Sequence, residues 1–496
     1  MSFSFLLKLS IFFTGFSGLV AEYLIATVAT YLLGNAVFQW SLVISFFLLF
    51  MGLGSRLSRY VKEENLLNTF VLTELCLSVL VSLSPLIAYG FAPDFLKLQI
   101  VIFILSAVLG TLIGLEIPLA VRLNNLYEEL KINISSILEK DYLGSLPAGL
   151  LYSLVFLPKL GIVHTALVAG VLNLFVASLF AFRFLRGFLL KLLIVVVGIL
   201  LVLYGIYAER IYLIQEQKFY GEKIELFKQT PYQKIVLTRF GNHYSLYLDG
   251  HLQFSTLDEK YYHEAIVHIP TSFVRHYHKA LILGGGDGLA LRELLKYPFK
   301  EIKLVELDEK MIRLSKEHPI FRKINEGSFS DPRVKVVIDD AFNFVFKTKE
   351  RYDLVVIDLI DPRTPSAARV YSLEFYKRLK EILHAEGVFI TQATDIFFER
   401  KVFCSILNTI KAAGFKVYPF HVSVPSMGDV GFIIGSLRDL SVKDEILKNF
   451  REDLTSVISR DYSLALFSFP KNYSCEGVEI NSLIKPKVLD YYFQNH

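Results

Sequence analysis

Acidic side chains recur where short apolar segments end in the second half of this sequence. The stretch "ALILGGGDGLALREL" (280–294) runs from an apolar segment through four glycines and Asp287 into a helical pattern. The later apolar segments also end in acids or an amide, at Glu306, Asp308, Asp340, Asp358, Asp361 and Gln392. A helix N-cap would explain a single Asp. A set of this size indicates a site that holds cations or moves protons.

The glycine-rich stretch is typical of a nucleotide cradle, but its acid restricts the ligand. Asp287 would repel phosphates, and no P-loop lysine accompanies the glycines. It would also disfavour the carboxylate of S-adenosylmethionine. Glu306 stands 22 positions after Gly284, the separation at which an acid binds a ribose hydroxyl, and Asp340 with Ala341 is placed to meet an adenine edge. These residues favour a nucleoside that ends in an ammonium group, together with an amine.

The elements that position these residues follow from the periodicity of the sequence. Within 211–275, "QKIVLTRFGNHYSLYLDGHLQFS" alternates apolar and polar residues around two turn signals, which predicts a small antiparallel β meander. Within 276–496, short apolar strands alternate with helical segments, which predicts an α/β doubly wound sheet with parallel strands. Such sheets bind ligands beyond the carboxyl ends of their strands, where the acids stand.

Residues 1–210 differ in composition from the rest of the chain. The sequence is 53% hydrophobic and 20% charged, with a mean hydropathy of +0.45, and most of its charges follow residue 210. Windows that approach the roughly 20 apolar residues needed to span a bilayer lie at 6–32, 37–54, 67–91, 98–120, 142–160, 162–182 and 188–207. We therefore predict an all-α, multi-pass transmembrane domain over 1–210, with the lipid bilayer as its partner.

The number of crossings depends on the fifth window. Pro147 and Pro158 interrupt it, so it is either a spanning helix or a broken, re-entrant one. Basic residues follow the second, fourth and sixth windows, and the positive-inside rule places such loops in the cytoplasm. Seven crossings would put the second half of the chain outside the cell, whereas six would put it in the cytoplasm.

Acids also occur in or at the ends of the apolar windows, at Glu22, Glu74, Glu116 and Asp141. Carboxylates at membrane depth usually face the interior of a helix bundle. They would either cap helix ends and bond to neighbouring helices or line a cation path. Their nearness to window ends favours the first alternative.

Composition also excludes several classes of site. The formal net charge of +4 comes without a basic stripe, so we expect no nucleic-acid partner. The three cysteines, Cys76, Cys404 and Cys475, show neither metal-ligand spacing nor a paired framework. We therefore predict neither a metal site nor a disulfide.

Residues 228–437 resemble the spermidine synthases, which are polyamine aminopropyltransferases. The shared blocks are, in order, "YLDG…Q…DE…YHE" (247–264), "GGGDG" with "LREL", "VELD", "DPRVKVVIDDAFNF", "YDLVVIDLIDP", "YSLEFY" and "TQ". The first part of the chain is similar to a membrane-attached subgroup, with Glu22 in its first window and "GLGS" (52–55) closing the second. The resemblance implies a Rossmann-like, methyltransferase-type sheet in 276–496. It also implies aminopropyl transfer from decarboxylated S-adenosylmethionine to an amine such as putrescine, giving spermidine and methylthioadenosine.

Carried over onto the matching positions, the resemblance implies roles for individual residues. The donor would be held by Gln233, His263, Asp287, Glu306, Asp340 and Ala341. Asp358 would be the catalytic residue that takes a proton from the acceptor amine, which Tyr262, Asp361 and Gln392 would position. We expect no metal and no cofactor besides the donor, because a sulfonium is already a good leaving group.

Two departures from the family pattern leave the acceptor open. Leu359 and Ile360 stand where the family commonly has serines, and "SVPSMGDVGF" (423–432) lacks the tyrosine that often walls the amine pocket. The alternatives are an S-adenosylmethionine-dependent methyltransferase and a membrane sensor or transporter that binds polyamines without turnover. We expect a homodimer or homotetramer, and a catalytic domain in the cytoplasm, where the donor is made.

Overall fold

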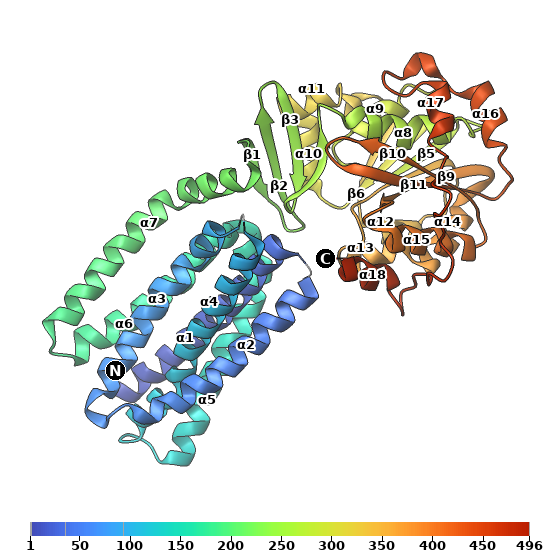
Figure 1. Cartoon of the computed structure of the whole chain (residues 1–496). Helices are drawn as coiled ribbons and strands as arrows, with labels where there is room; N and C mark the ends of the chain where they lie inside the picture. The colour runs from blue at the N-terminus through green and yellow to red at the C-terminus, as the bar shows by residue number, and fades with distance from the viewer. Residues whose placement is uncertain (1, 35, 93, 496) are drawn as a thin grey trace. The chain divides into compact units, whose positions relative to one another are not determined.

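The computed structural model describes residues 2–34, 36–92 and 94–495 (Figure 1). Contacts divide the chain into two compact units, Met1–Pro231 and Tyr232–His496. The helical part therefore extends beyond residue 210, because its last long helix and the strand that follows it belong to the first unit.

The first unit is a bundle of long apolar helices: α1 (Phe3–Leu33), α2 (Ala36–Leu57), α3 (Leu66–Gly90), α4 (Phe95–Asn124), α5 (Leu130–Leu151), α6 (Gly161–Phe184) and α7 (Phe188–Tyr220). The strand β1 (Lys223–Gln229) follows them. Among the described residues, six helical runs are long and apolar enough to cross a membrane by length and composition. One of these runs, Leu130–Phe184, contains both α5 and α6.

Glycines allow close contacts between the helices of this unit. A Cβ built on Gly114 of α4 would overlap the Met51 carbonyl oxygen of α2, and a Cβ on Gly54 would overlap the Thr111 carbonyl oxygen. Small residues at such crossings let two helix backbones approach, which is how helices associate where no hydrophobic effect drives them together.

The interrupted fifth window forms a continuous helical run. Helix α5 passes through Pro147 to Leu151 and continues as a π-helical stretch, Tyr152–Leu160, which leads directly into α6 at Gly161, where φ is +71°. Pro147 and Pro158 therefore lie within the helical run without breaking it. Two of the acids, Glu74 and Glu116, are buried in the interior of the bundle.

The second unit begins with the predicted meander. Strands β2 (Lys234–Phe240), β3 (His243–Leu248) and β4 (His251–Ser255) pair antiparallel in sequence order. Asp249 and Gly250 form the turn between β3 and β4 with positive φ values of 50° and 83°. Helix α8 (Glu259–Thr271) then leads into the main sheet.

The main sheet has seven strands in the order β10-β11-β9-β8-β5-β6-β7. Five of them are parallel, as predicted: β5 (Lys279–Gly284), β6 (Glu301–Glu306), β7 (Val334–Ile338), β8 (Tyr352–Asp358) and β9 (Leu383–Asp395). The other two, β10 (Lys416–Val424) and β11 (Gly428–Ser436), are antiparallel, which the alternation of strands and helices did not reveal. These two strands are antiparallel because only a few residues connect them, and a parallel pair needs a long crossover connection.

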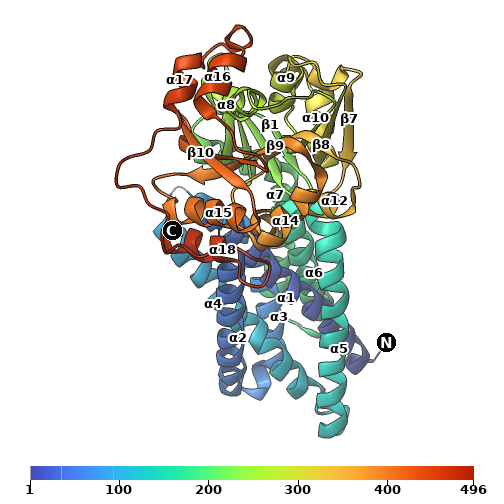
Figure 2. The ribbon, with the colours of Figure 1, turned by 90° about the vertical axis from the view of Figure 1, so that its right-hand side faces the viewer.

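Helices cover both faces of this sheet (Figures 1 and 2). Along β5, Ala280 and Ile282 belong to the core cluster under α8 and α9 (Leu289–Leu294), whereas Leu281 and Leu283 belong to the opposite cluster. That second cluster lies under α12 (Ala341–Lys347), α14 (Leu373–Ile382), α15 (Arg400–Ala412) and α18 (Lys487–Asn495). Burial on both faces explains why the central strand β5 is apolar from Ala280 to Leu283.

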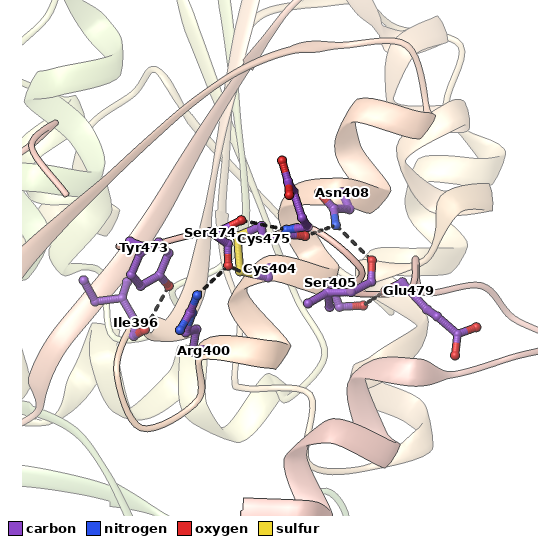
Figure 3. The surroundings of a disulfide bond; sticks show 11 residues. Ile396, Arg400, Cys404, Ser405, Asn408, Tyr473, Ser474, Cys475 and Glu479 are labelled. Carbon is purple, nitrogen blue, oxygen red and sulfur yellow. Dashed lines mark hydrogen bonds between the residues drawn. A yellow bond between two sulfur atoms is a disulfide. The ribbon is translucent and has the colours of Figure 1, made fainter. Parts of the chain in front are cut away.

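A disulfide joins Cys404 of α15 to Cys475 of the C-terminal segment (Figure 3). The prediction that the cysteines are unpaired was therefore wrong for these two. They are 71 positions apart in sequence, and only the packing of the C-terminal segment along α15 brings them together. Neighbouring hydrogen bonds hold the same segment: Asn408 Nδ2 donates to the Cys475 and Val478 carbonyls, and Arg400 Nη2 donates to the Ser474 carbonyl.

Candidate active site

The glycine turn lies at the carboxyl edge of the sheet, against the ends of the strands on both sides of β5. Gly284, Gly285 and Gly288 have positive φ values of 84°, 61° and 86°. A Cβ on Gly286 would lie 2.8 Å from Glu306 Oε2, and a Cβ on Gly285 would lie 3.1 Å from Asp358 Oδ2. Only glycine combines this backbone with such close neighbours, so the turn forms a bare backbone surface between two carboxylates.

Asp287 is fixed within this turn by its own helix. Its Oδ1 accepts a hydrogen bond from the Leu289 backbone N–H at 2.8 Å, and its carbonyl accepts one from Asn325 Nδ2 at 3.0 Å. Burial raises the pKa of the Asp287 carboxyl to about 6, although nearby His263 lowers it. A cationic ligand would stabilise the charged form, which is the preference expected from the sequence.

His263 stands on α8 within a buried chain of charges. Its Nδ1 lies 2.8 Å from Glu259 Oε2, and Arg292 Nη2 lies 3.0 Å from the same carboxylate. Burial alone would lower the His263 pKa, but the Glu259 hydrogen bond and charge raise it to about 8. No local pattern indicates the supporting contacts of Glu259 and Arg292, because only the fold brings the "DE" and "LREL" blocks together.

Asp358 ends β8 beside the glycine turn. The Tyr262 hydroxyl donates to Asp358 Oδ1 at 2.8 Å. Burial raises the pKa of Asp358, whereas His263 and the Tyr262 hydrogen bond lower it. Burial also raises the pKa of Tyr262 well above its usual value, so the phenol keeps its proton and remains a donor. A half-buried carboxylate in this setting is suited to accept a proton.

The next loop brings Asp361 and Gln392 together. Gln392 Nε2 donates to Asp361 Oδ1 at 2.7 Å. The single Tyr371 hydroxyl proton is shared between two acceptors, Gln392 Oε1 at 3.2 Å and the Ile360 carbonyl at 3.0 Å. Tyr371 is fully buried and orients this pair. It was not recognised as a site residue, although it lies in the quoted "YSLEFY" block.

On the other side of the turn, Glu306 ends β6 and Asp308 follows it by two positions. Glu306 Oε1 accepts from the Asp308 backbone N–H at 3.0 Å, and burial raises the Glu306 pKa to about 7. Asp308 Oδ1 caps helix α10 (Glu309–Glu317), while its Oδ2 accepts from Gln233 Nε2 at 3.1 Å. Gln233 is thereby held by the residue that follows β6 by two positions, and its role in donor binding stays a prediction.

The last pair stands at the end of the neighbouring strand β7. Asp340 caps α12 by accepting from the Asn343 backbone N–H at 3.0 Å, and Arg369 pairs with its other oxygen. Ala341 is the first residue of that helix and is buried. Asp340 and Ala341 thus lie at the same carboxyl edge of the sheet as the glycine turn. The hydrogen bonds of the Asp340 carboxylate go to α12 and Arg369. In the described part of the chain, no group of three or more His, Cys, Asp or Glu side chains is arranged to hold a metal ion.

Comparison with known proteins agrees with this architecture. The family described as Spermine/spermidine synthase domain matches residues 259–444. The chain is 61% identical over 494 residues to polyamine aminopropyltransferase 2 of Aquifex aeolicus strain VF5. The match covers 100% of this chain and 99% of that protein. It is 37% identical over 491 residues to the polyamine aminopropyltransferase of Leptospira interrogans, with 98% and 97% covered.

A solved structure, spermidine synthase in complex with the transition state analogue AdoDATO, is 26% identical with a TM-score of 0.46, and the match covers 50% of this chain and 86% of that one. The match to the Aquifex protein, by contrast, extends through the helical unit as well as the sheet. With full-length relatives of this kind, and with acids at the ends of its parallel strands, the chain belongs to the polyamine aminopropyltransferase family.

Proposed function

We propose that this chain transfers an aminopropyl group from decarboxylated S-adenosylmethionine to a di- or polyamine such as putrescine, with Asp358 as the base. The observation that carries the proposal is the position of Asp358, which borders the glycine turn and accepts a hydrogen bond from Tyr262. The products are the extended polyamine, spermidine when putrescine is the acceptor, and methylthioadenosine.

The donor side of the site is assigned to the residues around the glycine turn. Glu306 would accept hydrogen bonds from the ribose hydroxyls, and Asp340 with Ala341 would meet the adenine. Asp287 would bind the ammonium that replaces the amino-acid end of S-adenosylmethionine, and it would repel the carboxylate of that compound. Gln233 and His263 complete the donor-binding set.

The acceptor side is assigned to Asp358, Tyr262, Asp361 and Gln392. An amine is protonated near neutral pH and cannot attack until it loses a proton, so the Asp358 carboxylate accepts that proton. The amine nitrogen then forms a bond to the methylene carbon next to the sulfonium as the carbon–sulfur bond breaks. The electron pair of that bond stays on sulfur and neutralises it, releasing methylthioadenosine. Alignment of the two substrates by the four side chains supplies much of the rate.

We further propose that the helical unit is embedded in the cell membrane and that the catalytic unit faces the cytoplasm, where the donor is made. The support for the membrane is the set of six apolar helical runs. The chain would assemble as a homodimer or homotetramer.

The test uses the purified full chain in detergent, with decarboxylated S-adenosylmethionine and a panel of diamines and polyamines. Release of methylthioadenosine together with an extended amine is the expected result. A methyltransferase would instead consume S-adenosylmethionine and methylate the acceptor, and a binding protein without turnover would consume neither donor.

A further inference from the structure

One side chain at the acceptor side of the site has no role in the reaction just described. Arg363 follows Asp361 by two positions, and its Nη2 donates to Asp361 Oδ2 at 3.0 Å. Its backbone N–H also donates to the Asp361 carbonyl at 2.7 Å. The second carboxylate oxygen, Oδ1, is taken by Gln392. Both oxygens of Asp361 are therefore occupied by the chain's own donors.

The two partners of Asp361 differ in charge and in freedom. Gln392 is neutral, buried, and fixed by Tyr371. Arg363 is a permanent cation whose side chain is 32% exposed, so water can hydrate its guanidinium when another cation takes its place on Asp361.

The C-terminal helix holds the guanidinium in this place. Arg363 lies over the ring of Tyr492 in α18, with 5.4 Å between the guanidinium carbon and the ring centroid. His251 of β4 contacts the guanidinium through Nδ1. Tyr492 is only 8% exposed, so the stacked arrangement is built into the core of the unit. Tyr492, from the C-terminal helix, therefore packs against the loop that carries Asp361 and Arg363.

We propose that Arg363 is the resident cation of the acceptor site. Its guanidinium neutralises Asp361 in the free enzyme, and the ammonium of an acceptor displaces it on binding. After transfer, the return of Arg363 to Asp361 helps to release the more highly charged polyamine product. Arg363 thereby weakens the binding of both acceptor and product. The inference rests on the proposed role of Asp361 in binding the acceptor.

The test is the Arg363→Ala variant, assayed with saturating donor and varied putrescine. Removing the competing cation should lower the KM for the amine by about two- to fivefold, the effect of losing one half-exposed ion pair. The inhibition constant of the polyamine product should fall by a similar factor, and the KM for the donor should stay unchanged. Arg363→Gln, which keeps a polar side chain of similar length, should give the same direction if the alanine variant folds poorly.

The matched control is Arg313→Ala, which removes an equally charged residue that pairs with Glu317 on the exposed face of α10. It should leave all constants unchanged, which excludes a general effect of net charge on the attraction of amines. A KM for the amine that rises or does not move in Arg363→Ala would overturn the proposal, because it would make Arg363 a support for Asp361.

Asp361→Asn separates this inference from the proposed function. If the asparagine variant does not raise the KM for the amine, Asp361 does not bind the acceptor, and both the assignment and the inference fail. If it raises that KM while Arg363→Ala fails to lower it, only the inference fails. In the double variant, the effect of Arg363→Ala should vanish, since its partner is then uncharged.

Discussion

The Tyr262 hydroxyl donates to Asp358 Oδ1 at 2.8 Å, which joins helix α8 to the end of strand β8 at the centre of the site. The ring of Tyr262 packs on Phe432 with 5.2 Å between centroids, so the hydroxyl has a fixed direction. One carboxylate oxygen of Asp358 is therefore oriented by the protein, and the other borders the glycine turn. This arrangement leads to the first two predictions.

Replacing Asp358 with asparagine should remove turnover while donor binding survives. The amide cannot accept the ammonium proton, and loss of a positioned base costs about 10²-fold or more in rate. Methylthioadenosine release measures turnover, and calorimetry measures donor affinity. Asp439→Asn, at an exposed position paired with Lys416, is the control and should behave like the parent protein. Near-normal turnover in Asp358→Asn would refute the assignment of the base.

Tyr262→Phe should move the acidic limb of the pH–rate profile to higher pH. The Tyr262 hydrogen bond lowers the pKa of Asp358, against the burial that raises it. Without the hydroxyl, the pKa rises further, so a larger share of Asp358 is protonated at a given acidic pH and cannot act as a base. The profile of kcat over pH checks this. Phenylalanine keeps the ring packed on Phe432, so a shift to lower pH would contradict the electrostatic argument.

Asp287→Asn should reduce discrimination between the decarboxylated donor and S-adenosylmethionine. The carboxylate attracts the donor ammonium and repels the carboxylate of the competitor, and the amide does neither. The measurement is the ratio of the two dissociation constants at pH 8. This pH lies above the Asp287 pKa of about 6, so the parent side chain is charged. At pH 5 it is mostly protonated, and the parent ratio should approach that of the variant. A ratio that is insensitive to both changes would show that Asp287 does not read the donor.

Loss of the disulfide between Cys404 and Cys475 should loosen the C-terminal segment. Closing a loop of 71 positions restricts the unfolded chain, and the chain-entropy estimate of its stabilisation is up to about 4 kcal/mol. Hydrogen exchange of residues 467–495 in Cys404→Ser should become faster, whereas Cys76→Ser should leave it unchanged. Thiol titration of the unfolded, unreduced protein should detect Cys76 alone. Three reactive thiols would mean that the bond does not form.

Reporter fusions should locate the catalytic unit in the cytoplasm. A fluorescent protein that matures only inside the cell should be active when fused after Lys131 and at the C-terminus, and a phosphatase active only outside should be active after Arg186. This pattern corresponds to six crossings. Phosphatase activity at the C-terminus would place the catalytic unit outside, as seven crossings predict, and would require an external supply of donor.

Much of the second unit could be predicted from local sequence patterns. The alternation of short apolar segments with helical ones predicts the strands of 276–496 and their parallel direction. The same pattern places Glu306 and Asp358 at strand ends, because each short segment of sequence already shows where its strand stops. The family resemblance rests on residues in the same segments. The antiparallel pair β10 and β11 was missed because strand direction depends on the length of the connection, and apolar content does not report it.

Tertiary structure alone decided the contacts between distant segments. Tyr262 and Asp358 are 96 positions apart, and Cys404 and Cys475 are 71 apart, so neither pair has a local signal. The sequence around Arg363 does not indicate its contact with Tyr492, because that contact forms only when α18 packs against the loop. The residue types at the sheet edge are properties of the sequence. Which of them share a proton, a cation or a hydrogen bond depends on distances that only the packed chain defines.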